Sequence, residues 1–173
     1  HILQDSSRGA GKELFSNSTD DEETYSTSIT SWNTDGFVLG SREPINANGE
    51  TYVSWNWKAN GGTTSSNSDG SITSTVQANT TAGFSIVTFT GNGSNDATIG
   101  HGLATTPAMI ITKNRDDSVS WRIWHKDLTA TNVLFFSTSG TIVPSGQSNG
   151  YIKTVGSSTY SVYQGNSDTN GVN

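Results

Sequence analysis

Short runs of alternating apolar and polar residues recur along the chain, and residues that favour turns separate them. The clearest run is 51–58 (TYVSWNWK), in which Val53, Trp55 and Trp57 fall on one side of an extended strand. The other candidate strands are 84–90, 108–113, 121–125, 133–137 and 160–163, with weaker ones at 36–39 and 72–76. The Asn-Gly pairs, which tolerate the positive φ angles of tight turns, lie at 48–49, 92–93, 149–150 and 170–171. This pattern predicts an all-β fold, specifically an antiparallel β-sandwich of the jelly-roll or lectin-like kind.

The alternation in 51–58 also predicts which side chains form the core. Val53, Trp55 and Trp57 share one face, so we expect all three to point inward and to have structural roles. Truncating Trp57 to alanine is then expected to lower the free energy of unfolding by about 3 to 5 kcal/mol.

The composition supports strands over helices. Gly, Ser, Thr and Asn together make up about half of the 173 residues, and these types are poor helix formers. One short helix is predicted near 18–25, where Asp20 to Glu23 follow a candidate N-cap at Ser18 or Thr19, because acidic residues favour a helix N-terminus.

The chain is predicted to contain two related β repeats, 1–59 and 82–173, joined by a linker rich in Gly, Ser, Thr and Asn at 60–81. A shift of 120 residues aligns the first repeat with the second. The aligned pairs are Ile2-Leu3 with Arg122-Ile123, Leu14 with Leu134, Phe15 with Phe135 and, after small gaps, Phe37 with Tyr160.

In this alignment the first repeat lacks its N-terminal strands and the second lacks its final strand, which indicates a fragment or a processed chain. An exposed sheet edge left in this way needs a cover. Three covers are possible: the run 52–58 of the same chain, a strand of a neighbouring copy, or further sequence of a longer polypeptide.

The charge restricts the expected partners. Fifteen acidic residues against nine basic ones give a net charge of −6, and no basic patch points to nucleic acid. No apolar run approaches the roughly 20 residues needed to cross a bilayer, so no membrane insertion is expected. The absence of cysteine excludes disulfides and thiolate metal sites.

No catalytic set can be recognised, and we expect no enzymatic activity. His101 lies in a Gly-His-Gly-Leu stretch that predicts a structural turn. No cofactor is expected except calcium, for which Asn92, Asn95 and Asp96 are the best local oxygen ligands although they form no EF-hand loop.

The aromatic residues carry the best binding hypothesis, because sugars stack on exposed rings while polar neighbours bind their hydroxyls. Trp121 and Trp124 fall on opposite faces of one candidate strand, and Tyr160 and Tyr163 on opposite faces of another. One member of each pair can therefore lie in the core while the other faces a ligand.

Several stretches resemble a family of repeated β domains in structural proteins of marine bacteriophages, which are described as tail fibre proteins. The stretches are SRGAGKELFSNST at 7–19, DGFVLGS at 35–41, NGETYVSWNWKA at 48–59, AGFSIV at 82–87, GHGL at 100–103 and PAMIITKNR at 107–115.

The resemblance implies an extracellular, non-enzymatic structural or attachment module of a virion, part of a phage tail fibre or similar appendage. It implies other virion proteins as partners, a homo-oligomer such as a trimer, and loops that bind a host-surface glycan. The alternative is a carbohydrate-binding module of a secreted bacterial enzyme, and the genes next to the parent gene would distinguish the two.

Overall fold

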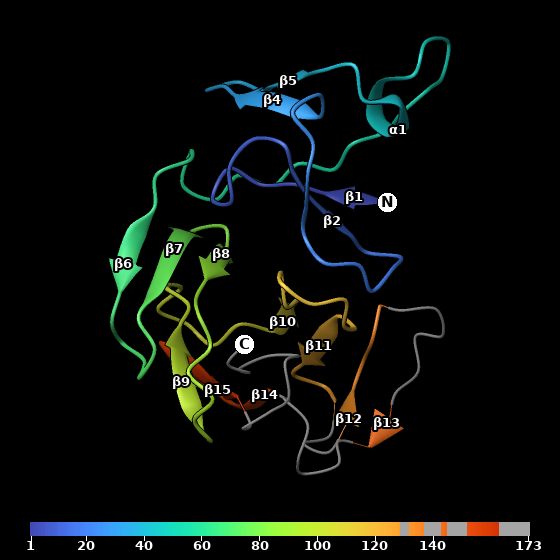
Figure 1. Ribbon diagram of the computed structural model, residues 1–173. Helices are drawn as coiled ribbons and strands as arrows, with labels where there is room; N and C mark the ends of the chain where they lie inside the picture. The colour runs from blue at the N-terminus through green and yellow to red at the C-terminus, as the bar shows by residue number, and fades with distance from the viewer. Residues whose placement is uncertain (129–131, 137–142, 145–151, 163–173) are drawn as a thin grey trace.

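The computed structural model describes residues 1–128, 132–136, 143–144 and 152–162 (Figure 1). Within these residues the strands are β1 (Ile2–Leu3), β2 (Lys12–Phe15), β3 (Glu23–Thr24), β4 (Ile29–Trp32), β5 (Phe37–Leu39), β6 (Ser65–Asn67), β7 (Ser74–Asn79), β8 (Phe84–Thr88), β9 (Ala97–Gly100), β10 (Met109–Thr112), β11 (Arg122–His125), β12 (Asn132–Val133), β13 (Val143–Pro144), β14 (Ile152–Val155) and β15 (Thr159–Val162). The helix in this part of the chain is the short α1 (Glu43–Asn46). No helix among the described residues is long and apolar enough to cross a membrane.

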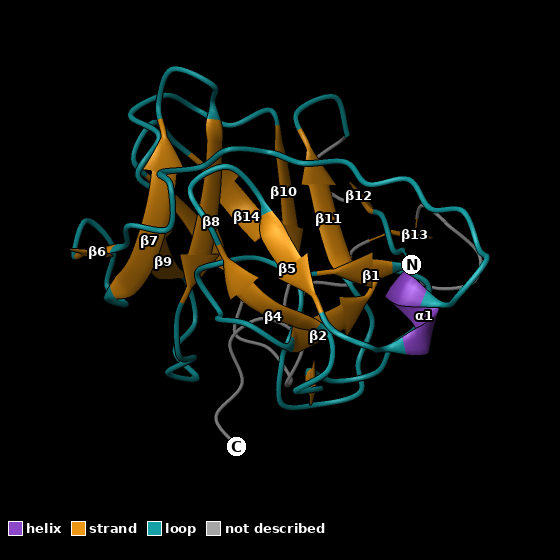
Figure 2. Ribbon diagram, turned by 90° about the horizontal axis from the view of Figure 1, so that it is seen from above, coloured by secondary structure: helices purple, strands orange, loops and turns teal. Residues whose placement is uncertain are grey.

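The strands form small antiparallel sheets (Figures 1 and 2). Among the described residues, three sheets have three strands, in the orders β1-β2-β3, β6-β7-β8 and β14-β15-β9, and three are pairs, β4-β5, β10-β11 and β12-β13. The predicted all-β class is therefore confirmed. The finer assignment, a jelly-roll or lectin-like sandwich, stays a prediction.

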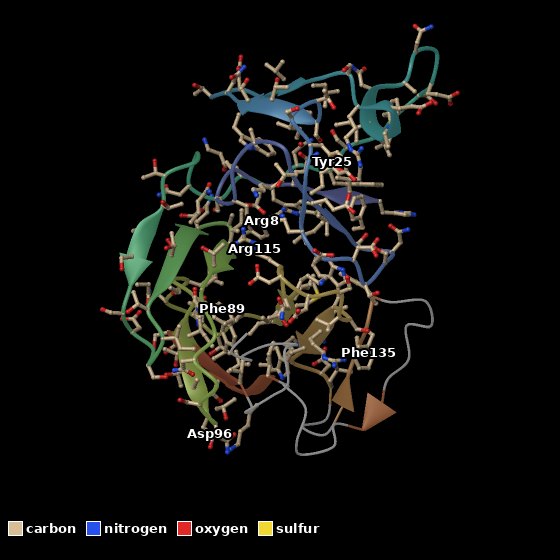
Figure 3. All side chains as sticks on the ribbon, viewed as in Figure 1. Arg8, Tyr25, Phe89, Asp96, Arg115 and Phe135 are labelled. Atoms are coloured by element: carbon tan, nitrogen blue, oxygen red, sulfur yellow. The ribbon has the colours of Figure 1, made fainter. Side chains whose placement is uncertain are left out.

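The main apolar core lies where β9 and β15 meet. Ile99 and Val162 are completely buried on these two strands, and Tyr160 lies opposite Ile99 in the ladder. The buried cluster consists of Ile72, Ala97, Ile99, Ile152, Tyr160 and Val162, and it is covered by Val87, Phe89, Ile110, Trp124 and Val155. Phe89 is labelled in Figure 3. Burial of this apolar surface is the main favourable term that holds the second repeat together.

The backbone pairing of the described strands repeats at the shift of 120 residues used to align the sequence. Strands β1, β2 and β3 correspond to β11, β12 and β13 after a shift of 120 residues, with the same register. The equivalent pairs are Leu3↔Leu14 with Ile123↔Leu134, Lys12↔Thr24 with Asn132↔Pro144, and Glu13↔Glu23 with Val133↔Val143.

The second half of each repeat also corresponds, now with a shift of 123 residues. The β4-β5 pair matches the β14-β15 pair, and each contains a register shift at the same place. The equivalent pairs are Ile29↔Leu39 with Ile152↔Val162, Ser31↔Val38 with Thr154↔Ser161, and Trp32↔Phe37 with Val155↔Tyr160. A shared bulge is a conserved feature of related sheets and not an accident of one loop.

The segment 60–81, predicted to be a linker, takes part in a sheet over part of its length. It contains β6 and β7, and the side chains of Ile72 and Val76 are buried. A Cβ at Gly70 would lie 2.2 Å from the carbonyl oxygen of Thr98, so the chain needs glycine there to approach β9 closely. Small residues in 60–81 therefore permit close packing of the backbone. A flexible linker has the same composition, so composition alone does not distinguish the two.

The helix predicted near 18–25 is wrong, because these residues form no helix and include β3. The Ser18 hydroxyl donates to the Asp20 carboxylate and accepts a bond from the Asp20 backbone N–H, and such local bonds offer the backbone an alternative to a helix. The acidic run serves a different purpose, because Glu22 binds arginines from other parts of the chain.

Glu22 pairs with Arg8 of the first repeat and with Arg115 of the second, and both arginines are labelled in Figure 3. Its carboxylate accepts two hydrogen bonds from Arg115, at 2.9 and 2.7 Å, and one from Arg8 at 2.9 Å. Its backbone N–H donates to the carbonyl oxygen of Arg115 at 2.9 Å. Burial alone would raise the pKa of Glu22, but the hydrogen bonds and charges of Arg115 and Arg8 outweigh it and hold the pKa below its ordinary value.

A carboxyl group whose pKa is lowered by folding stabilises the protein above its unfolded pKa, near 4.5, and loses that contribution as the pH falls through the lower folded value. We therefore expect Glu22→Gln to flatten the loss of stability between neutral and acidic pH. Urea midpoints measured from pH 7 down to about pH 3 test this. Glu50→Gln, at an exposed turn, is the control, and equal pH profiles for Glu22→Gln and the parent would contradict the assignment.

Candidate functional site: the exposed aromatic strap

The run 51–58, here called the aromatic strap, forms no strand in the structure. The prediction of an inward face is wrong, because Val53, Trp55 and Trp57 are 71%, 72% and 66% exposed. Large aromatic side chains exposed together on a protein surface are unusual and mark interaction sites.

Hydrogen bonds hold the strap at its N-terminal end. The Tyr52 hydroxyl accepts a bond from the backbone N–H of Ala47 at 2.9 Å and donates to the carbonyl oxygen of Glu43 at 3.1 Å. Tyr52 thus fixes the start of the strap to helix α1, which contains Glu43. The Asn48-Gly49 turn lies between them, and the positive φ of Gly49, +86°, lets the chain reverse there.

The C-terminal end of the strap is held against β7. The side chain of Asn79 donates to the carbonyl oxygen of Lys58 at 3.1 Å, and Ala59 is buried. Gln77, also on β7, accepts bonds from the backbone N–H groups of Asn60 and Gly62 at 3.2 and 2.9 Å. Both ends are therefore fixed, and the aromatic residues between them face solvent.

Trp57 has a further support. Its indole stacks on the ring of Phe84, the first residue of β8, with ring centroids 6.4 Å apart and planes inclined by 24°. Trp55 lies two residues earlier in the strap, where the Asn56 amide donates to the Ser54 hydroxyl at 3.0 Å. The strap thus presents one ring that is oriented by a stacking partner and a second ring that is more exposed.

Polar groups lie directly beside the strap, around a shallow hollow where it meets β7. The hollow is lined by Lys58, Ala59, Asn60, Gly61, Ala78, Asn79 and Thr80. Amide, hydroxyl and ammonium groups next to exposed indoles are the combination that binds sugars, because the rings contact the C–H faces while the polar groups bond the hydroxyls.

Three of the four residues predicted from sequence to bind a ligand, Trp121, Trp124 and Tyr160, lie in the described part of the chain, and each packs inside the protein or against its core. Trp121 is buried, and its indole N–H donates to the carbonyl oxygen of Phe15 at 2.9 Å, so it joins the two repeats. Tyr160 is a core residue, and its burial raises its pKa. Trp124 packs against the same core. Tyr163 lies outside the described residues, so no ligand-binding role for it is tested.

His101 occupies a buried turn that follows β9 directly. Its Nδ1 accepts a bond from the backbone N–H of Leu103 at 3.2 Å, and its Nε2 lies 3.2 Å from the carbonyl oxygen of Gly156. Gly102 has a φ of +71°, which the sharp reversal requires. Both ring nitrogens are thus engaged by backbone groups, in agreement with a structural role.

The candidate calcium loop is engaged by groups of the protein itself. The Asn92 side-chain oxygen accepts the backbone N–H of Ser94 at 2.9 Å, and Asp96 pairs with Lys153 at 2.6 Å (Figure 3). Asn95 lies in the same loop. Across the described ranges no cluster of three or more His, Cys, Asp or Glu side chains is suited to a metal. Calcium binding by Asn92, Asn95 and Asp96 stays a prediction.

The sequence pattern contained a signal for the strap but not for its exposure. The alternation of residue types in 51–58 indicates that one side of the segment is apolar and the other polar. It does not indicate whether another part of the protein covers the apolar side. Gly61 and Gly62, which follow the strap after two intervening residues, both have positive φ, and the chain turns there before it reaches β6.

Comparisons with curated proteins and with solved structures gave no match. A family model matches residues 1–173, and its description is a domain of unknown function, DUF7483. The match covers the aromatic strap, both repeats and the junction between them. The chain is a member of the DUF7483 family.

Proposed function

We propose that this protein is a non-enzymatic glycan-binding module and that the aromatic strap is its binding surface. The observation that carries the proposal is the exposure of Trp55 and Trp57 on a segment that is hydrogen-bonded at both ends. A surface fixed before the ligand arrives loses less conformational freedom on binding than a mobile loop, so more of the contact energy appears as affinity.

Neutral sugars suit this surface better than anionic ligands do. The chain carries a net charge of −6, which disfavours phosphate-rich partners, and the hollow beside Trp57 is lined by only one charged residue, Lys58. A pyranose ring that stacks on Trp57 would place its hydroxyls near the polar lining of that hollow.

The resemblance to phage structural proteins supports a setting for this activity. We propose an attachment module of a phage tail fibre or similar appendage, in which the strap contacts a glycan of the host surface. An extracellular place, other virion proteins as partners and assembly into a homo-oligomer belong to the same proposal. The alternative, a carbohydrate-binding module of a secreted bacterial enzyme, would use the same strap and differs in the domains encoded next to it.

Removing the strap indoles is expected to abolish sugar binding without unfolding the protein. On a printed array of neutral oligosaccharides, with calcium and with chelator, the wild type should bind a defined set of glycans. The double variant Trp55→Ala/Trp57→Ala should bind these about 30-fold or more weakly, since central aromatic contacts contribute about 2 kcal/mol or more.

The control is Met109→Ala, which removes an exposed apolar side chain of β10 outside the strap and should bind like the parent. Because both indoles are exposed, the loss of unfolding free energy should be modest, about 0.5 to 1.5 kcal/mol for Trp57→Ala from its lost stacking on Phe84. Equal binding by the double variant and the parent, or no binding of any neutral glycan by the parent, would refute the proposal.

A further inference from the structure

One edge of β5 has no partner strand in the described part of the chain. β5 pairs with β4 alone, and Val38 and Leu39 are 44% and 39% exposed. Its equivalent in the second repeat, β15, has partners on both edges, β14 on one and β9 on the other. The repeat therefore shows what a covered version of this edge looks like.

The β4-β5 and β14-β15 hairpins correspond in individual hydrogen bonds. They share the register shift within β4 and β14. They also share the bond that closes the turn, from Asn33 N–H to the Gly36 carbonyl oxygen and from Gly156 N–H to the Thr159 carbonyl oxygen, both at 2.8 Å. The edge of β5 thus has the backbone geometry that holds β9 in the second repeat.

Two observations show which backbone groups face this edge. The backbone N–H of Gly40 donates to the carbonyl oxygen of Ser28, which precedes β4. Backbone groups of successive strand residues point to opposite edges, so those of Leu39 and Phe37 point to the edge of β5 away from β4. In the second repeat the carbonyl oxygen of Ser158 accepts a bond from the backbone N–H of His101, which follows β9. Two residues further on, the backbone groups of Tyr160 therefore point to β9 as well. Tyr160 is the equivalent of Phe37, so the two observations agree.

The side chains on the open edge also keep the character of the covered one. Phe37 is in the position of Tyr160, and Leu39 is in the position of Val162. In the second repeat these positions face Ile99 and Ala97 of β9 across the ladder. Both strands therefore carry an aromatic residue and, two positions later, an aliphatic one. On β15 these two residues lie opposite an Ile and an Ala of β9.

We propose that the edge of β5 binds one further antiparallel strand of the β9 kind, supplied by another repeat of this family. The strand would place an Ile opposite Phe37 and a small residue opposite Leu39, as Ala97–Gly100 does on β15. A second copy of this chain is a poorer source, because its own β9 is already bonded to β15 and bridged to Ile72. This mode of recognition is β-augmentation, in which backbone bonds supply affinity and alternate side chains supply specificity.

The test uses a synthetic peptide with the sequence of residues 94–102, SNDATIGHG, labelled and titrated with the full chain. We expect saturable binding at one site and slower hydrogen exchange of the Phe37 and Leu39 amides in the complex. A peptide with Pro in place of Ile99 lacks the N–H that would face β5 and should bind at least about tenfold more weakly.

Two variants of the protein test the site itself. Leu39→Pro removes an N–H from the open edge, where proline is tolerated, and Leu39→Lys places a charge opposite the small residue of the incoming strand. Both should weaken the peptide at least about tenfold, whereas Val38→Ala, whose backbone faces β4, should not. If Leu39→Pro does not fold, Leu39→Lys decides.

Three results would overturn the proposal. The first is no saturable binding up to about 1 mM peptide, beyond which an interaction is too weak to be specific. The second is equal binding by the Leu39 variants and the parent. The third is a dimer of the parent that Leu39→Lys converts to a monomer and that the peptide does not dissociate, since a second copy would then occupy the edge. None of these results bears on sugar binding at the strap.

Discussion

Replacing Glu13 by alanine is expected to lower the free energy of unfolding by about 3 to 5 kcal/mol, because it leaves a partly buried cation without its counter-charge. Glu13 is completely buried on β2. The Arg42 guanidinium contacts both carboxylate oxygens at 2.9 Å, and the Ser28 hydroxyl donates to one of them. Arg42 also lies over the ring of Tyr25, 3.3 Å from its centroid.

Urea denaturation of Glu13→Ala, Arg42→Ala and the double variant measures this expectation. The double variant should lose much less than the sum of the single losses, because removing the second partner removes the unpaired charge. Glu43→Ala, which removes an exposed carboxylate on the adjacent helix, is the matched control and should change stability by no more than about 0.5 kcal/mol. A loss below about 1 kcal/mol for Glu13→Ala would show that this network contributes little to the first repeat.

Truncating Ile99 to alanine is expected to cost about 2 to 5 kcal/mol, because the side chain lies at the centre of the main core and leaves a cavity. Ile99 is completely buried, pairs with Tyr160 across the β9-β15 ladder, and forms a parallel bridge with Ile72. Neighbours on both sides are held by their own ladders, so the cavity has little room to collapse.

Ile111→Ala is the control for this substitution, since Ile111 is the same residue type on β10 and is 41% exposed. Its loss should be below about 1 kcal/mol. Urea midpoints at an unchanged slope measure both variants. Similar losses for Ile99→Ala and Ile111→Ala would contradict the placement of the core between β9 and β15.

Strand positions were predicted well where apolar runs were short and bounded by turn residues. The candidates 84–90, 108–113, 121–125 and 160–163 contain β8, β10, β11 and most of β15. The repeat was detected from a few aligned residues, because equivalent strands need equivalent side chains at each register position. The ladder pairs Leu3↔Leu14 and Ile123↔Leu134 are the clearest example.

The functional residues were predicted less well, since their environment depends on distant parts of the chain. Trp121 and Tyr160 looked available for a ligand and are buried, while Trp55 and Trp57 looked buried and are exposed. The tryptophans in both sets sit in apolar, β-prone runs with similar local patterns. The difference is that Trp121 meets Phe15, more than a hundred residues away, whereas Trp55 is exposed.

The sequence by itself determined the all-β class and the places of about half of the described strands. These follow from side-chain alternation, the backbone freedom of Asn and Gly, and poor helix propensity, which act over a few residues. Only the tertiary structure decided that 72–77 is packed, that Glu22 joins the repeats and that the strap stays exposed. Each of these depends on contacts between segments far apart in the chain. The local sequence pattern does not indicate which distant segment will pack against a given residue.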